Sequence, residues 1–126
     1  VAARRMLSVV RVDDIVARVG GDEFVLLLPG MADATALHLV AQRLISALEE
    51  PVSDEARSYR ISASIGGTIC RGAARVDPET LLAVTDHALY TAKEAGRGRH
   101  VIDATPHSAP PTAPAQVAQG EAICSR

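Results

Sequence analysis

The sequence predicts an α/β layer fold, in which helices pack on an antiparallel or mixed β-sheet. Two apolar runs separated by the segment GGDE at 20–23 predict a β-hairpin, because glycine accepts the positive φ that tight hairpin turns need. Two later stretches, 34–49 and 78–95, repeat apolar side chains at helical spacing. Between them, apolar and polar residues alternate over 59–65, which is the period of a strand.

The hairpin is expected to use residues 15–19 and 24–28 as its two strands. The first run is rich in β-branched residues, which favour strands. The second is apolar throughout, which is typical of a strand buried on both faces. Pro29 and Gly30 then end it. Ahead of the hairpin, residues 1–9 are expected to form the end of a helix whose start has no cap.

Both long helices have recognisable start and stop signals. Asp33 is a suitable N-cap for the helix over 34–49, and Pro51 stops that helix. Asp77 is followed by a proline and an acid, which favours the first turn of the second helix. Gly96 is a suitable C-terminal stop.

The remaining segments complete the sheet and the tail. Gly66 and Gly67 are expected to bend or bulge the middle strand before it continues to Cys70. Residues 101–102 are expected to form a short edge strand. From Asp103 onward the chain is rich in proline and has no apolar periodicity, so we expect residues 103–126 to be a disordered tail.

The composition is that of a soluble, single-domain protein and gives no sign of a membrane-spanning, disulfide-rich or nucleic-acid-binding protein. The 126 residues suffice for one domain, and 48% hydrophobic with 22% charged residues is ordinary for a soluble globular protein. The net charge of −2 gives no argument for DNA or RNA binding. Cys70 and Cys124 predict no disulfide framework, and no run is long enough to span a membrane, so we expect a cytoplasmic location. The histidines show no metal-ligand spacing: His38, His87, His100 and His107.

Three short segments in order carry a family resemblance. The first, RVGGDEF at 18–24, puts two glycines and two acids at the hairpin tip, and taken alone it is most often a solvated turn. The second is SIG at 64–66, and the third is ALYTAKEAGR at 88–97. Together they resemble the GGDEF family, the diguanylate cyclases of bacteria. The resemblance implies a nucleotidyl-cyclase-like palm, as a partial GGDEF domain over 1–102 followed by the tail 103–126.

The family resemblance implies a reaction, in which two GTP molecules condense to cyclic di-GMP and two pyrophosphates. Asp22 would be the catalytic metal ligand, or the base, and Glu23 would support the metal or the turn. The metal would be Mg²⁺ or Mn²⁺, since such ions bind carboxylates together with substrate phosphates. Gly20 and Gly21 would let the nucleotide lie against the backbone.

Two cations near the end of the last helix are also implied to bind substrate. Lys93 and Arg97 are four residues apart, so we expect them on one side of the helix, where the resemblance implies that they bind phosphates. Without the resemblance, they are ordinary basic residues that interact with the helix dipole. The implied mechanism brings two GTP-loaded domains face to face, so a homodimer is expected.

A second implied site precedes the hairpin. Arg11 and Asp14 form an RxxD pattern, which alone is most often a solvated pair. Arginine can donate a bidentate pair to phosphate or guanine, and aspartate can accept from guanine N–H groups. At this offset from the GGDEF segment, the resemblance implies an inhibitory site that binds the product cyclic di-GMP.

The sequence departs from the family pattern at its beginning. The family domain opens with a strand that carries a metal-binding Asp and a helix that recognises guanine, and neither precedes the segment that starts at Val1. We therefore expect Asp22 to lack a partner carboxylate and the sheet to lack a central strand, which leaves sheet edges and apolar surface uncovered. Gly98 stands where the family usually has Asn.

Three interpretations follow from this departure. In the first, the chain is part of a longer, active cyclase, and Val1 is an internal residue of that protein. Alternatively, it is a catalytically dead module that binds cyclic di-GMP through Arg11 and Asp14, or a fragment without function. The intact acidic motif favours the first interpretation. In each case we expect the 126-residue chain by itself to make little or no cyclic di-GMP.

Overall fold

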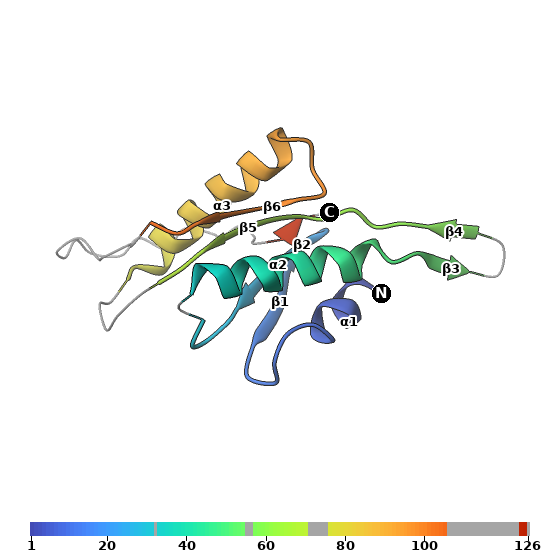
Figure 1. Cartoon of the computed structure of the whole chain (residues 1–126), viewed down its shortest axis with the longest axis horizontal. Coiled ribbons are helices and arrows are strands. Elements are labelled where there is room, and N and C mark those ends of the chain that lie inside the picture. The colour runs from blue at the N-terminus through green and yellow to red at the C-terminus, as the bar shows by residue number, and fades with distance from the viewer. Residues whose placement is uncertain (32, 55–56, 71–75, 106–123, 126) are drawn as a thin grey trace.

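The computed structural model describes residues 1–31, 33–54, 57–70, 76–105 and 124–125. Within these residues the helices are α1 (Ala2–Leu7), α2 (Ala34–Glu49) and α3 (Pro78–Glu94). The main sheet has the strand order β1 (Ile15–Gly20), β2 (Glu23–Leu27), β7 (Cys124–Ser125), β5 (Ser64–Thr68) and β6 (His100–Asp103). A separate pair, β3 (Val52–Asp54) and β4 (Arg57–Tyr59), extends away from the body in Figure 1.

The strand directions make the main sheet mixed. β1 and β2 are antiparallel, β7 is antiparallel to both β2 and β5, and β5 is parallel to β6. Therefore β2, β5 and β6 run the same way and begin at the same edge of the sheet. With the helices packed on it, this sheet confirms the predicted α/β class, and the expected edge strand is β6. Most of the predicted tail lies outside the described residues.

Both predicted helix starts are confirmed. The Asp33 carboxylate accepts hydrogen bonds from the backbone N–H groups of Thr35 and Ala36, both at 3.2 Å. The Asp77 carboxylate accepts one from the N–H of Thr80 at 3.0 Å. These bonds satisfy donors that the first turn of a helix otherwise leaves unpaired. The two starts are therefore set by local sequence.

The two glycines of β5 make room for neighbouring elements. A Cβ on Gly66 would meet the backbone of α3, at 2.7 Å from the Cα of Leu89. A Cβ on Gly67 would lie 2.6 Å from Cδ1 of Ile102 and 3.5 Å from the side chain of Leu37 in α2. Because successive strand residues face opposite sides, α3 and α2 cover opposite faces of the sheet.

The expected bend or bulge at these glycines is wrong. Residues 65–68 pair with 100–103 in continuous parallel register, without a shift at either glycine. The glycines are explained by the close approach of α3 on one face and by Ile102 on the other. Gly66 is therefore needed because α3 packs closely on β5. From one sequence, a glycine with this role cannot be told from a glycine at a bulge.

The strand predicted over 59–65 is also corrected. The structure has β4 ending at Tyr59 and β5 beginning at Ser64, with no regular strand over 60–63. The sequence prediction missed β3 and β4, which pair as an antiparallel hairpin directly after α2. The described side chains of β4 are all exposed, so this hairpin lacks the apolar alternation by which a strand is predicted.

The core joins α1, α2 and the sheet. Arg5 links α1 to the end of α2. Its guanidinium donates hydrogen bonds to the backbone carbonyls of Leu48 at 2.8 Å, Glu50 at 2.5 Å and Pro51 at 3.0 Å. Leu48 lies in the last turn of α2, whose carbonyls have no partner within the helix, and Glu50 and Pro51 directly follow the helix. The buried apolar cluster of the core consists of Ala2, Met6, Phe24, Leu26, Ala41, Leu44, Leu48, Ala63 and Ile65.

Substituting Arg5 with alanine is expected to lower the free energy of unfolding by about 2 kcal/mol, because charge-assisted hydrogen bonds to the end of α2 are lost. Urea denaturation of the 126-residue chain measures the effect. Arg4→Ala is the matched control, since Arg4 is an exposed neighbour on the same helix. Equal stabilities of the two variants would contradict the assigned role of Arg5.

Candidate functional site

The acidic tip of the β1–β2 hairpin is built on a two-residue turn. β1 includes Gly20 and β2 begins at Glu23, so Gly21 and Asp22 form the turn, and Gly21 has a φ of +47°. No atom lies within 4 Å of a Cβ built on either glycine. The Asp22 side chain is exposed and that of Glu23 is half-buried. The tip therefore presents open backbone next to a carboxylate.

Arg18 holds this turn in place. Its Nε donates to the backbone carbonyl of Gly21 at 2.8 Å, and its Nη2 donates to the same oxygen. The pairing between β1 and β2 shifts register between Arg18 and Gly20, so the chain bulges next to the turn. A guanidinium fork on the turn carbonyl fixes the direction in which the tip points. Arg18 is the first residue of the RVGGDEF motif, but its position in the motif does not predict this role.

The strand directions bring the acidic tip and the two predicted phosphate-binding cations to one edge of the sheet. The tip immediately precedes β2, and the loop that carries Arg97 immediately precedes β6. Since β2 and β6 begin at the same edge, both segments lie there. Three strand spacings separate β2 from β6, which is about 14 Å. That span is far longer than a hydrogen bond, so the tip and the Arg97 loop do not contact each other directly.

The helical relation predicted between Lys93 and Arg97 is wrong. Lys93 lies in the last turn of α3, but the helix ends at Glu94. Arg97 lies beyond it, with a left-handed φ of 59°, so the two side chains do not share a helix face. Gly96, at φ 113°, ends the helix as predicted, and its N–H donates to the carbonyl of Lys93 at 3.2 Å.

The Arg11–Asp14 pair forms a closed turn at the other edge. The N–H of Arg11 donates to Oδ2 of Asp14 at 2.7 Å, and the N–H of Asp14 donates to the carbonyl of Arg11 at 3.1 Å. The Arg11 side chain is exposed. The turn precedes Ile15, at the opposite end of β1 from the acidic tip, so the length of β1, about 20 Å, separates the two segments.

A family model described as the GGDEF domain of diguanylate cyclases matches residues 1–99. This chain belongs to the GGDEF family. Relatives include the bifunctional diguanylate cyclase/cyclic di-GMP phosphodiesterase MucR of Pseudomonas aeruginosa, 40% identical over 75% of this chain and 14% of MucR. The probable diguanylate cyclase DgcE of Escherichia coli is 38% identical over 79% of this chain and 9% of DgcE.

Solved structures agree with this assignment. The GGDEF domain of TpbB (YfiN) from Pseudomonas aeruginosa has a TM-score of 0.70 and 31% identity, over 80% of this chain and 59% of that one. An EAL/GGDEF domain protein from M. capsulatus has a TM-score of 0.67 and 38% identity, over 80% of this chain and 64% of that one. The expected cyclase palm fold is thereby confirmed. This GGDEF chain spans less than two thirds of each of these relatives.

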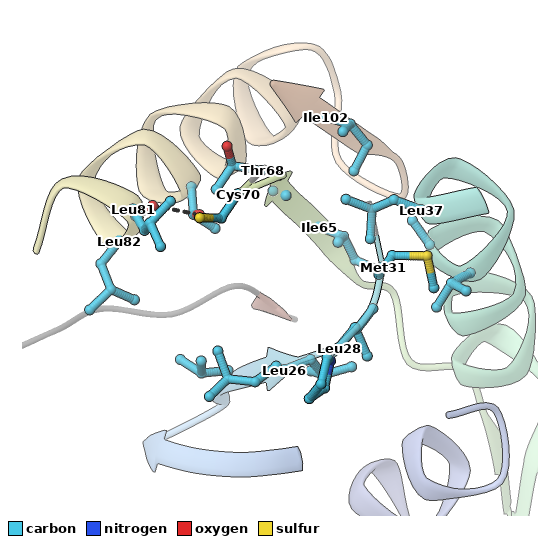
Figure 2. Close-up of a pocket in the computed structure, with 18 of the residues that line it drawn as sticks. Leu26, Leu28, Met31, Leu37, Ile65, Thr68, Cys70, Leu81, Leu82 and Ile102 are labelled. Carbon is cyan, nitrogen blue, oxygen red and sulfur yellow. Dashed lines mark hydrogen bonds between the residues drawn. The ribbon is translucent and has the colours of Figure 1, made fainter. Parts of the chain in front are cut away.

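Between β2 and β5 this GGDEF domain has only the short strand β7 among the described residues, and Figure 2 shows the side chains that line a cavity beside it. β7 pairs with β2 at Phe24 and with β5 at Ser64 and Ile65, which leaves residues 25–27 and 66–68 without β7 partners. A cavity of about 540 Å³ lies there, and its lining comes from β2, α2, β5 and α3.

The lining of this cavity is almost entirely apolar, including Leu26, Leu28, Leu37 and Leu82. The lining holds no charged side chain, so the cavity itself offers no charged partner to phosphates or to a metal ion. The expectation that the second hairpin strand is buried on both faces is wrong in part. Leu26 is buried, whereas Leu27 is 54% exposed on the other face of β2.

The fold also brings together two histidines that lie far apart in the sequence. Nδ1 of His38 in α2 lies 3.0 Å from Nε2 of His100 in β6, although the two are 62 positions apart. His38 is exposed and His100 is half-buried. Burial, and secondly the neighbouring His38, lower the pKa of His100 below its usual value. Spacing along the chain gives no signal for this pair, because only the packing of α2 against β6 creates it.

None of the helices in the described part of the chain is both long and apolar enough to cross a membrane. Within the same residues, no group of three or more His, Cys, Asp or Glu side chains could hold a metal ion.

Proposed function

We propose that this GGDEF domain condenses two GTP molecules into cyclic di-GMP and two pyrophosphates. The observation that carries the proposal is the open acidic tip at 20–23, at the same sheet edge as Lys93 and Arg97. In each half-reaction, the 3′-hydroxyl of one GTP attacks the α-phosphate of the other. The new O–P bond forms as the bond to pyrophosphate breaks, and the hydroxyl proton is released. Two domains face to face would supply the two nucleotides, so we propose a homodimer in the cytoplasm, where GTP is made.

Each residue has a proposed role in this reaction. The Asp22 carboxylate suits a hard divalent ion, Mg²⁺ or Mn²⁺, which would neutralise phosphate charge when bound. Glu23 supports the tip, and the bare backbone of Gly20 and Gly21 lets the nucleotide approach closely. Lys93 and Arg97 neutralise the charge that develops on the departing pyrophosphate; their hydrogen bonds count most where that charge appears.

The decisive variant is Asp22→Asn in the full polypeptide that the native cell makes. Cyclic di-GMP formation from GTP and Mg²⁺ is expected to fall by about a hundredfold or more, equal to about 3 kcal/mol of transition-state stabilisation. Asp86→Asn is the matched control, because Asp86 is an exposed acid on α3. Turnover of the Asp22 variant at the rate of the control would refute the proposal.

The 126-residue chain alone is expected to make little or no cyclic di-GMP. Its described residues supply the acidic tip without a cluster of metal ligands, and only the short strand β7 of those residues lies between β2 and β5. Clear turnover of GTP by this purified chain would contradict that expectation. It would also mean that the tip and the cations suffice for the chemistry.

A second candidate function is binding of cyclic di-GMP without catalysis. The Arg11–Asp14 turn is closed by two hydrogen bonds of its own, and it lies at the sheet edge opposite to the acidic tip. Such a site does not depend on the cavity between β2 and β5. We therefore propose that it would bind the nucleotide even in a chain that has no cyclase activity.

A further inference from the structure

We propose that His38 and His100 form a binding site for a borderline divalent transition-metal ion, such as Zn²⁺, Ni²⁺ or Cu²⁺, that joins α2 to the edge strand β6. The two facing nitrogens, Nδ1 of His38 and Nε2 of His100, are 3.0 Å apart. Two nitrogens that bind one Zn²⁺ tetrahedrally lie about 3.3 Å apart, given Zn–N bonds of about 2.0–2.1 Å. The separation therefore needs to change by only a few tenths of an ångström, and the rings must turn so that both lone pairs point at the same ion.

Metal binding by this pair needs a tautomer change but no change in charge. In the hydrogen-bonded pair, one facing nitrogen carries a hydrogen and the other accepts it. If that hydrogen moves to the other nitrogen of the same ring, both facing nitrogens present lone pairs while both rings stay neutral. Neutral imidazole is a good ligand for Zn²⁺, Ni²⁺ and Cu²⁺, whereas Mg²⁺ prefers oxygen.

Both ligands are carried by regular elements, which fixes their separation before the ion arrives. His38 lies within α2, and the backbone of β6 at His100 is paired with Ile65 of β5. The nearby cation Arg99 is directed elsewhere, because its Nε donates to the carbonyl of Arg97 at 3.2 Å. β6 is the last strand of the sheet and His38 is exposed, so an ion can reach the pair from solvent.

The coordination at this pair would be incomplete. Among the described residues no third histidine, cysteine or acid joins the pair, so water or an added ligand would fill the remaining positions. We therefore expect reversible binding that strengthens the contact between α2 and β6, rather than a closed structural zinc site. The inference is independent of the proposed cyclase function, which uses the carboxylate of Asp22 and a different class of ion.

The test is a zinc titration of the 126-residue chain, prepared without an affinity tag and free of metal. Zn²⁺ alone is the probe, and competition with a chromogenic chelator at neutral pH measures its affinity. Cys70 and Cys124 are replaced by serine throughout, because an exposed thiol such as that of Cys70 also binds zinc. We expect saturable binding at a single site, and no displacement of zinc by the same concentration of Mg²⁺.

His38→Gln and His100→Gln are each expected to weaken zinc binding by about tenfold or more, equal to about 1.4 kcal/mol. His87→Gln is the matched control, since His87 is an exposed histidine on α3. Far-UV circular dichroism checks the fold. If the half-buried His100 variant fails to fold, the variant at the exposed His38 still decides the question. Absence of saturable binding, or equal affinity in the His38 and His87 variants, would overturn the proposal.

Discussion

Replacing Gly66 with alanine is expected to lower the free energy of unfolding of this GGDEF domain by about 3 kcal/mol or more. The new methyl group would meet the backbone of α3, 2.7 Å from the Cα of Leu89. A helix backbone cannot move aside as the tip of a side chain can, so β5 or α3 must shift as a whole. That shift would disturb the packing of Ala88 and Leu89, which are buried residues of α3 itself. Urea denaturation followed by circular dichroism measures the loss.

Two other glycines serve as graded controls for this prediction. A Cβ on Gly67 would meet Cδ1 of Ile102 at 2.6 Å, and that side-chain tip can rotate away at a smaller cost. A Cβ on Gly20 would meet nothing within 4 Å, so Gly20→Ala is expected to change stability least. If Gly66→Ala were no more destabilising than Gly20→Ala, α3 could not lie as close to β5 as the structure has it.

The parts of the fold that the sequence predicted correctly are those specified by neighbouring residues. Asp33 and Asp77 cap their helices through N–H groups two or three residues away. The Gly20–Gly21 pair specifies the hairpin in the same local way, because the turn needs a residue with positive φ. The acidic tip and the RxxD segment could therefore be located from the sequence alone, without knowledge of the tertiary structure around them.

The parts that could not be predicted depend on tertiary packing. His38 and His100 meet because α2 lies against β6, and no spacing rule joins positions that far apart. The left-handed φ of Arg97 removes it from the helix face that it was expected to share with Lys93. A glycine at 66 is compatible with either a bulge or a close helix, and only the position of α3 decides between them.

A second large effect is expected at the Arg11–Asp14 turn, where we propose that cyclic di-GMP binds. Arg11→Ala is predicted to weaken the binding of cyclic di-GMP to the 126-residue chain by about tenfold to a hundredfold, because a bidentate, charge-assisted pair is lost. The Arg11 side chain is exposed, while its backbone is held by Asp14. The substitution therefore removes the ligand contact and leaves the turn formed. Isothermal titration calorimetry with cyclic di-GMP measures the change.

Three further variants decide whether this turn is the binding site. Arg11→Lys keeps the charge without the guanidinium fork, so its affinity should lie between those of the wild type and Arg11→Ala. Arg43→Ala removes an exposed arginine from α2 and should leave affinity unchanged. Asp22→Asn should also leave it unchanged, since the length of β1 separates the acidic tip from Arg11. If Asp22→Asn weakened binding as much as Arg11→Ala did, cyclic di-GMP would be binding at the acidic edge, and the assignment of a separate product site to Arg11 and Asp14 would be wrong.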